Sequence, residues 1–479
     1  MPETWADTIR HLLVFLDEAI LVYFLMVNSF YALILIAAAW EMWRQARQIR
    51  GASRHVILGS KVTPTISILA PAYNEATTIT ESVRSLLTLY YPNLEVIVIN
   101  DGSKDQTVAV LMEQFDLIPV HPIYSQKIKT KAVQTLYRSR SHSNLVVVDK
   151  ENGGKADALN VGLNFSSGQL VCAIDADTLI EPDALLRMVR PFLLRDDIVA
   201  AGGTIRAVND SVARGGRVVE VRAPQNIFAG IQVVEYLRAF LFGRLGLNRL
   251  GGNLIISGAF GIFRRDAVLA AGGYARDTVG EDMELVVRLR REGFEQRGPH
   301  RVEFVPDPAA WTEVPESRQV LSRQRDRWHR GLVDVMWRHR RLFFNPRYKG
   351  MGLLIYPYFF FVELLAPVME SLGLIGLVVG LLAGLINLPF AILFFLVAYG
   401  YGLLLSAFTL LLEELSFHRH ESIKDRLTLL GWALLENLGY RHLSVIWRLR
   451  SMIKYLRGRT EWGAMTRRGF SNPTPTPKS

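Results

Sequence analysis

The sequence predicts an α/β domain with a mostly parallel sheet, set between hydrophobic segments that are long enough to cross a membrane. Half of the 479 residues are hydrophobic and the mean hydropathy is +0.18, which is high for a soluble protein and low for one lying wholly in a membrane. The longest apolar runs lie near the two ends of the chain. Between them, residues 65–305 alternate strand-like and helix-like stretches, which predicts a βαβ arrangement.

The first hydrophobic segment covers residues 19–40 and contains no charged residue. Its length suffices for one bilayer crossing, and no small-residue cleavage site follows it before Glu41 and Arg44. We therefore expect a retained transmembrane helix rather than a signal peptide. Basic residues follow the segment and acidic residues precede it, so the positive-inside rule places the N-terminus outside and the next segment in the cytoplasm.

The central region contains four apolar runs that predict strands, with helical stretches between them. The strands are expected at residues 66–70, 94–99, 145–148 and 170–174, and the helices at 79–89 and 156–164. These strands should form a buried sheet whose ligands bind at the carboxyl ends of the strands. Cys172 is the single cysteine, lies in the last run and is expected to be a buried thiol.

Four short polar motifs occur in a fixed order between the hydrophobic segments. They are Asn-Asp-Gly-Ser at residues 100–103, Asp-Ala-Asp at 175–177, Gly-Glu-Asp at 280–282 and Gln-Arg-Asp-Arg-Trp at 324–328. Each motif alone is weak evidence, because Asp-Gly-Ser is more often a plain turn. The first two directly follow predicted strands. Taken together, the four motifs predict a nucleotide-sugar site that faces a membrane.

Asp175 and Asp177 are the expected metal ligands. Two carboxylates one residue apart at a strand end can hold a divalent cation that bridges the two phosphates of a nucleotide sugar, and oxygen ligands favour Mg²⁺ or Mn²⁺. Lys155 follows two glycines at the start of a predicted helix, where a cation opposes the helix dipole, so we expect a functional role for it. Asp101 either reaches the uracil or ribose of the nucleotide or belongs to a helix cap.

Asp282 is the expected general base, which takes the proton of the acceptor hydroxyl, and Glu281 is its rival for that role. Trp328 offers a flat apolar face on which a sugar ring can stack, while Gln324 and Arg327 are expected to bond to hydroxyls or phosphate. The same stretch also fits a basic amphipathic helix at a membrane surface, and the two interpretations are compatible.

A second hydrophobic block covers residues 351–386 and resumes after residues 387–389 through residue 412, which predicts two further crossings. The stretch 427–446 contains charged residues and is expected to be re-entrant or interfacial. Glu363 and Glu370 lie on one helix face of the block. They either pair with basic side chains at the cytosolic boundary or line a polar passage.

The formal net charge is +10, from 55 Lys and Arg against 45 Asp and Glu. Much of the excess lies beside the hydrophobic segments, which indicates attraction to anionic membrane lipid and argues against nucleic acid as a partner. The basic C-terminal tail is expected in the cytoplasm.

The predicted parts are an N-terminal membrane segment (1–43), a cytoplasmic catalytic domain with interfacial helices (44–345), a C-terminal membrane domain (346–447) and a basic tail (448–479).

These motifs make the chain resemble the family-2 glycosyltransferases of the membrane-bound polysaccharide synthase type, which include hyaluronan, chitin, poly-N-acetylglucosamine and cellulose synthases. The resemblance implies a GT-A fold, inverting transfer from a UDP-sugar to a growing polysaccharide, and translocation of the polymer through the membrane segments. It assigns the nucleotide to Pro71, Tyr73, Glu75, Asp101, Lys155, Asp175 and Asp177. It assigns the acceptor to Ser257, Gly258, Gln324, Arg327 and Trp328, and a gating role to Trp462 and Arg467.

Two other functions remain open at this point. The first is non-processive transfer to a membrane lipid acceptor, and the Gln-x-x-Arg-Trp element argues against it because such enzymes often lack this element. The second is a non-catalytic export channel or scaffold, which the intact acidic motifs argue against. The resemblance implies a multi-pass protein of the inner (plasma) membrane with a cytoplasmic catalytic domain. It leaves the sugar, the linkage and any accessory subunit open.

Overall fold

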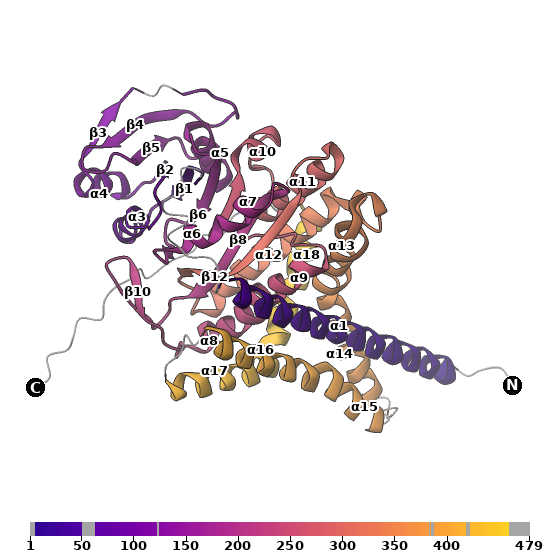
Figure 1. The fold of residues 1–479 in the computed structure, drawn as a ribbon. Coiled ribbons are helices and arrows are strands. Elements are labelled where there is room, and N and C mark those ends of the chain that lie inside the picture. The colour runs from indigo at the N-terminus through magenta and orange to yellow at the C-terminus, as the bar shows by residue number, and fades with distance from the viewer. Residues whose placement is uncertain are drawn as a thin grey trace, which may run out of the picture.

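A computed structural model describes residues 5–49, 63–121, 124–382, 384, 388–417 and 422–458. Within these residues the chain forms a ten-stranded sheet with strand order β3-β4-β5-β2-β1-β6-β11-β8-β12-β7 (Figure 1). The strands are β1 (Ile66–Ala72), β2 (Leu94–Asp101), β3 (Leu117–Val120), β4 (Val133–Ser139), β5 (Leu145–Lys150), β6 (Leu170–Ile174), β7 (Leu179–Ile180), β8 (Ile198–Ala207), β11 (Phe260–Arg264) and β12 (Arg301–Thr312). A separate hairpin pairs β9 (Val212–Arg214) with β10 (Arg217–Glu220).

The centre of the sheet is parallel, as the sequence predicts. Strands β5, β2, β1 and β6 pair in parallel, and β12 pairs in parallel with β8. Strand β11 runs antiparallel between β6 and β8, and β4 and β7 are antiparallel to their neighbours. The predicted class, a mostly parallel α/β sheet, is therefore confirmed.

Both faces of the sheet are buried. Ile66 and Ile68 of β1 belong to the apolar cluster on one face, while Leu69 belongs to the cluster on the other. This alternation follows from the two-residue period of a strand. The helices of this part are α3 (Ile79–Leu87), α4 (Thr107–Gln114), α5 (Lys155–Phe165), α6 (Ala184–Met188), α7 (Arg190–Leu194), α10 (Arg265–Ala270) and α11 (Glu281–Gln296).

All four strands and both helices expected from the sequence are present, with small differences in length. Strand β1 continues to Ala72, so Pro71 is the sixth residue of the strand and not the first residue after it. Cys172 is a buried free thiol in β6, as expected, and burial raises the pKa of that thiol.

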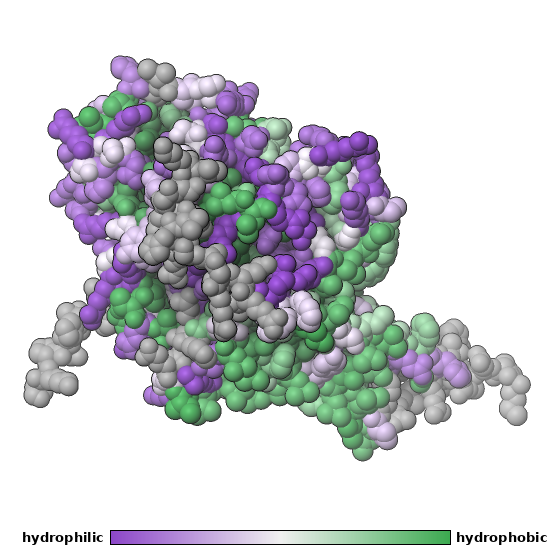
Figure 2. All heavy atoms as spheres, viewed as in Figure 1, coloured by the Kyte–Doolittle hydropathy of each residue, from purple (hydrophilic) through white to green (hydrophobic). Residues whose placement is uncertain are grey.

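The apolar helices lie on one side of the sheet, and α1 (Trp5–Ile49) runs along them as one long helix. Among the described residues, two helices are long and apolar enough to cross a membrane, at Val14–Arg44 and Ala391–Phe417. A third candidate is the pair Met351–Leu364 and Ala366–Leu382, whose two halves meet at a bend of 42° beside Pro367. Figure 2 shows a continuous hydrophobic surface over these helices.

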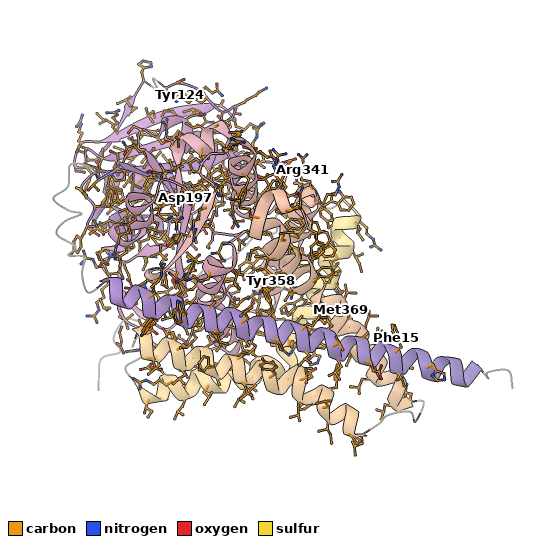
Figure 3. All side chains as sticks on the ribbon, turned by 45° about the vertical axis from the view of Figure 1, so that its right-hand side comes forward. Phe15, Tyr124, Asp197, Arg341, Tyr358 and Met369 are labelled. Carbon is orange, nitrogen blue, oxygen red and sulfur yellow. The ribbon has the colours of Figure 1, made fainter. Side chains whose placement is uncertain are left out.

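Figure 3 separates the two parts of the molecule: Tyr124 and Asp197 mark the sheet domain, whereas Phe15 and Met369 mark the apolar helices. Tyr358 lies between them. The helices that join and complete the two parts are α8 (Ile227–Glu235), η1 (Tyr236–Gly243), α9 (Arg244–Leu250), α12 (Arg318–Arg338), η2 (Arg340–Leu342), η3 (Pro346–Tyr348), η4 (Met351–Ile355), α13 (Tyr356–Tyr358), η5 (Phe359–Leu364), α14 (Ala366–Leu382), α15 (Leu388–Phe395), η6 (Leu396–Gly400) and α16 (Tyr401–Phe417).

The stretch expected to be re-entrant or interfacial forms α17 (Ile423–Leu435), η7 (Glu436–Tyr440) and α18 (Arg441–Leu456). It is not among the candidate spans found within the described residues. Arg441 pairs with Glu370 at 2.8 Å, and Arg448 lies 4.0 Å from the Glu363 carboxylate. Both glutamates therefore meet basic side chains, as one of the two alternatives expects.

Candidate active site

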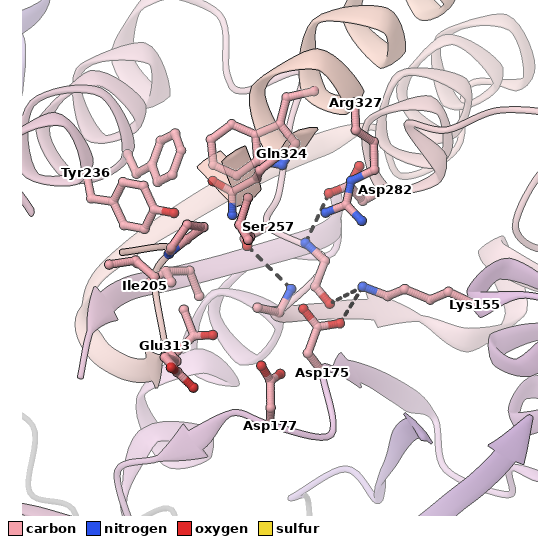
Figure 4. Close-up of a pocket in the computed structure, with 18 of the residues that line it drawn as sticks. Lys155, Asp175, Asp177, Ile205, Tyr236, Ser257, Asp282, Glu313, Gln324 and Arg327 are labelled. Atoms are coloured by element: carbon pink, nitrogen blue, oxygen red, sulfur yellow. Dashed lines mark hydrogen bonds and ion pairs between the residues drawn. The ribbon is translucent and has the colours of Figure 1, made fainter. Parts of the chain in front are cut away.

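A cavity of 540 Å³ lies at the carboxyl ends of the sheet strands. Figure 4 shows Asp175 and Asp177 on one side of it and Gln324 and Arg327 on the other. Its lining comes from the loop after β6, the segment before β11, the start of α11, the end of β12 and one face of α12. The lining residues include Lys155, Asp175, Asp177, Tyr236, Phe240, Ser257, Gly258, Glu281, Asp282, Glu313, Gln324, Arg327 and Trp328.

Lys155, the first residue of α5, is paired with Asp175 across the cavity wall. Its ammonium also lies 3.4 Å from the carbonyl oxygen of Gly258. Burial alone would lower the pKa of Lys155, but the charges of Asp175 and Glu281 outweigh it and the pKa is raised. The ammonium therefore stays charged, and this ion pair accounts for a cation at an otherwise unfavourable helix start.

The two aspartates fit a metal ion that is shared with a ligand. Asp177 is only 3% exposed, and both carboxylates line the cavity directly after β6. Among the described residues, no group of three or more His, Cys, Asp or Glu side chains forms a complete metal cage. Mg²⁺ commonly takes one or two protein carboxylates and completes its shell with phosphate oxygens and water. Such a pair would supply the protein's share of that shell, and the assignment of Asp175 and Asp177 as metal ligands stays a prediction.

Asp282 and Glu281 begin α11, where a negative charge is favoured by the helix dipole. The Asp282 carboxylate accepts hydrogen bonds from the backbone N–H groups of Gly258 at 3.1 Å and Met283 at 2.7 Å. Gly258 leaves this contact open, since a Cβ there would lie 3.0 Å from the Lys155 ammonium. Burial raises the pKa of Glu281 to about 7, the charge of Asp282 adds to the rise, and Lys155 opposes it.

Gln324, Arg327 and Trp328 project from one face of α12 into the cavity. The Arg325 guanidinium lies 4.5 Å from the centre of the Trp328 ring system, and Phe240 packs against that ring at 5.8 Å. Arg325 in turn donates two hydrogen bonds to Glu235, at 2.7 and 2.8 Å. The indole is therefore held in one orientation at the cavity wall.

Two family models match this chain. "Glycosyl transferase family 2" matches residues 67–270, and "Glycosyl transferase family group 2" matches residues 170–405. The first match covers the strands that present Asp101 and Asp175, and the second continues through Asp282 and Trp328. The chain belongs to glycosyltransferase family 2. With the mostly parallel sheet described above, this confirms the GT-A class that the resemblance implies.

Curated relatives of this glycosyltransferase include two poly-beta-1,6-N-acetyl-D-glucosamine synthases. The one from Staphylococcus aureus (strain COL) is 30% identical over 276 residues, which cover 57% of this chain and 56% of the relative. The one from Staphylococcus epidermidis is 29% identical over 292 residues, 61% of this chain and 59% of the relative. The matches thus span little more than half the length of these relatives.

Among solved structures, a mannosyltransferase from Pyrobaculum calidifontis in complex with GDP-Man and Mn²⁺ aligns with a TM-score of 0.49 at 18% identity, over 87% of this chain and 99% of that one.

Several residues predicted to bind nucleotide lie outside the lining of the cavity. Pro71 lies in β1 and Tyr73 is exposed beyond it, while the Glu75 carboxylate accepts a hydrogen bond from Thr78 at 2.7 Å. These residues stand at the same edge of the sheet as Asp175 in the family-2 glycosyltransferase. Their assignment to the nucleotide stays a prediction. The proposed gating residues Trp462 and Arg467 lie outside the described residues.

Asp101 holds the loop that leads into α5. Its carboxylate accepts hydrogen bonds from the Lys150 ammonium at 2.5 Å and from the backbone N–H groups of Gly153 and Gly154 at 2.9 and 2.8 Å. The loop passes so close that a Cβ on Gly102, whose φ is +65°, would lie 2.8 Å from the Asn152 nitrogen. In this glycosyltransferase Asp101 therefore fixes the backbone from which Lys155 projects.

The part of the site that comes from β12 and η1 was not predicted from the sequence. Glu313 follows β12, while Tyr236 and Phe240 belong to η1, and all three line the cavity. Glu313 and Glu316 follow the carboxyl end of β12. They would have been candidate site residues if residues 301–312 had been predicted as a strand.

A second cavity of 380 Å³ adjoins the first. The two cavities share Phe240, Ser257, Val279, Asp282 and Trp328 as lining residues. The second cavity extends between the apolar helices, where its further lining includes Tyr31 and Leu35 of α1, Arg244 and Leu247 of α9, Tyr358, Glu363, Leu405, Thr409 and Arg448. In the glycosyltransferase, the Asp282 carboxylate thus stands between a site at the sheet edge and a cavity among the helices.

Proposed function

We propose that this glycosyltransferase transfers a sugar from a UDP-sugar to a growing polysaccharide, with inversion, and that the product leaves through the second cavity. The observation that supports the proposal most directly is the shared wall of the two cavities. Asp282 and Trp328 line the first cavity together with Asp175 and Asp177, and they also line the second, which reaches α1 and α16. An acceptor chain in the second cavity would therefore meet a donor in the first.

The proposed chemistry begins with the acceptor hydroxyl, whose proton passes to a carboxylate oxygen of Asp282. The freed oxygen forms a bond to the anomeric carbon of the donor as the bond from that carbon to the diphosphate breaks, and UDP leaves with the electron pair. A Mg²⁺ or Mn²⁺ ion held by Asp175 and Asp177 would stabilise the charge that develops on the leaving diphosphate. Lys155 contributes a positive charge on the same side of the cavity.

Trp328 provides the surface on which the acceptor sugar stacks, and Gln324 and Arg327 supply hydrogen-bond donors beside it. The stacking face is fixed because Arg325 and Phe240 hold the indole in place. A fixed platform favours an acceptor that returns to the same position after each addition, which processive transfer requires.

The first donor to test is UDP-N-acetylglucosamine, because the curated relatives are named for a polymer of N-acetyl-D-glucosamine. We propose a multi-pass position in the inner membrane, with the sheet domain in the cytoplasm and the basic segments against anionic lipid.

The deciding experiment uses the full chain in lipid nanodiscs with a panel of radiolabelled UDP-sugars and Mg²⁺ or Mn²⁺. UDP release and the size of the labelled product are measured together. We expect one donor to give a polymer. A single sugar on a lipid would instead support the non-processive alternative, and no release of UDP from any donor would support a scaffold.

The contribution of the indole platform can be measured in the same assay. Trp328→Ala should shorten the product and slow elongation more than donor hydrolysis. Trp337→Ala is the matched control, because Trp337 lies on the same helix and is 64% exposed, away from the cavity. Equal losses of elongation and hydrolysis in Trp328→Ala would contradict a role in acceptor stacking.

A further inference from the structure

Arg244 is a buried arginine in the second cavity that the proposed chemistry does not use. It is the first residue of α9, is 5% exposed and lines the cavity shared with Asp282. Among the described residues, its Nη1 atom has no hydrogen-bond partner. Its guanidinium group lies 4.5 Å from the centre of the Phe240 ring. Nη1 of Arg244 is therefore shielded from solvent and gains no acceptor from the part of the chain that the structure describes.

Arg290 is a second buried arginine, and its hydrogen-bond partners differ from those of Arg244. It is 3% exposed, and its three nitrogens donate to the backbone carbonyl groups of His300, Asn253 and Gly251 at 3.3, 2.9 and 2.5 Å. A buried donor that lacks such a partner costs folding free energy, and a ligand that supplies an acceptor would remove this cost. Burial lowers the pKa of Arg244 to about 10 despite the nearby charge of Asp282, so the group remains positive at neutral pH.

The position of Arg244 is fixed by its helix. Helix α9 packs so closely on α1 that a Cβ on Gly246 would lie 2.2 Å from the carbonyl oxygen of Ile34. The close packing therefore leaves no room for α9 to shift toward α1. The Phe240 ring that it covers packs in turn against Trp328, the proposed sugar platform. The cavity wall beside Asp282 is therefore continuous, and it consists of the Arg244 guanidinium, the Phe240 ring and the Trp328 indole.

We propose that Arg244 binds the acceptor sugar: its guanidinium group donates hydrogen bonds to hydroxyl or carbonyl oxygens of the sugar unit that stands next to Asp282. This inference rests on the proposed function. The partner it fits is an oxygen-rich carbohydrate that enters from the second cavity. An arginine suits the task better than a lysine, because its planar fork presents several donors in a fixed geometry and is less strongly hydrated.

The test measures acceptor binding separately from donor binding. Full-length Arg244→Met in nanodiscs is assayed with UDP-N-acetylglucosamine and with short N-acetylglucosamine oligosaccharides as acceptors. We expect the acceptor KM to rise roughly 10- to 100-fold, as for loss of a charged hydrogen bond, while the donor KM and the Kd for UDP stay unchanged. Arg244→Lys should recover part of the loss because it retains the charge.

Arg249→Met is the matched control. Arg249 lies on the same helix, is 38% exposed at its side chain, and pairs with Glu41 outside both cavities. It should leave the acceptor KM at the wild-type value. If Arg244→Met does not fold, Arg244→Lys provides the same comparison, with a smaller expected rise.

The outcomes separate this inference from the proposed function. An unchanged acceptor KM in a folded Arg244 variant would overturn the inference alone. Equal losses of UDP binding and acceptor binding, together with a lower melting temperature, would assign Arg244 a structural role and overturn it as well. Absence of transfer by the unaltered protein with every donor would overturn the proposed function and the inference with it.

Discussion

Glu281 and Asp282 are adjacent in the chain, yet their carboxylates have different surroundings. Glu281 is 6% exposed and its pKa is raised by burial, whereas Asp282 accepts hydrogen bonds from two backbone N–H groups and stands at the junction of the two cavities. Of these two carboxylates, only that of Asp282 belongs to a residue that lines both cavities. Its position therefore suits the group that receives the acceptor's proton.

Asp282→Asn should reduce sugar transfer by roughly 10²- to 10⁴-fold, the usual effect of losing a general base. The Kd for UDP should be unchanged, because the carboxylate acts on the acceptor and not on the nucleotide. Turnover and calorimetric UDP binding are measured on the same preparation, with the exposed Asp266→Asn as control. Wild-type turnover in Asp282→Asn would rule the residue out as the base and return the role to Glu281.

Glu281 should make the stability of the protein depend on pH. Its pKa is about 7 in the folded protein against an ordinary value of 4.5, so the folded state binds this proton more tightly than the unfolded state. The stabilising contribution is complete below pH 4.5 and is lost as the pH rises through 7. The melting temperature should therefore fall over this range more steeply in the wild type than in Glu281→Gln.

The control for this measurement is Glu113→Gln, because Glu113 is exposed on α4. It should keep the wild-type slope of melting temperature against pH. Identical slopes in the wild type and Glu281→Gln would show that the Glu281 proton is bound equally well in the folded and unfolded states.

The site residues that could be predicted are those next to local signals. Asp175 and Asp177 follow the end of an uninterrupted apolar strand, and Asp282 lies in a short acidic motif. Arg244 could not be predicted, because it is one of several arginines in a helical stretch and only the packing of α9 on α1 makes it a buried cavity residue. Its significance comes from its Nη1 atom, which has no hydrogen-bond partner among the residues that the structure describes, and a sequence does not show this.

At the scale of elements, ion pairs connect the sheet domain to the apolar helices. Arg206 of β8 lies 2.8 Å from Glu413 of α16, with side-chain exposures of 7% and 3%. Arg238 of η1 donates to Glu436 of η7 at 2.5 and 2.8 Å. These contacts tie the cavity-forming segments to both parts of the molecule, so the second cavity depends on their relative position.

Arg206→Met should lower the free energy of unfolding by about 3–5 kcal/mol, because it removes the cation that lies 2.8 Å from the buried Glu413 carboxylate. The double variant Arg206→Met/Glu413→Leu should recover most of this loss, since no buried charge remains. Unfolding of the detergent-solubilised protein is followed by denaturant titration. The exposed pair formed by Arg195 and Asp197 is the control, and Arg195→Met should cost about 0–1 kcal/mol. No recovery in the double variant would mean that packing, not charge, holds this contact.

The strands that could be predicted are those whose sequences are continuous apolar runs. β5 and β6 are examples, and both begin at the residue expected. β8 contains two consecutive glycines, and β12 contains Glu303, Pro306 and Asp307, so neither resembles a strand locally. Their pairing with each other, and that of β8 with β11, makes them strands. Such pairing joins residues far apart in the chain and has no local signature.

At the scale of the whole molecule, the remaining question is which side of the membrane each part occupies. We expect His11, which precedes the Val14–Arg44 helix, to lie outside, and Gln126 in the sheet domain to lie in the cytoplasm. Single cysteines at these positions in a Cys172→Ala background are treated in intact cells with a membrane-impermeant thiol reagent. Both positions are exposed in the structure.

His11→Cys should react in intact cells, whereas Gln126→Cys should react only after the cells are opened. The reverse pattern would invert the whole assignment, including the cytoplasmic donor site. Reaction of both positions in intact cells would contradict a membrane barrier between them.

The π-helical segments η1 and η5 limit how this protein can change its length during evolution. Both contribute lining residues to the second cavity, through Phe240 and Glu363 among others. A π-turn holds one residue more than an α-turn. Deleting a single residue there would return the segment to α-helical spacing and change which of its side chains face the cavity. Insertions and deletions should therefore accumulate in the surface hairpin of β9 and β10 and be absent from η1 and η5.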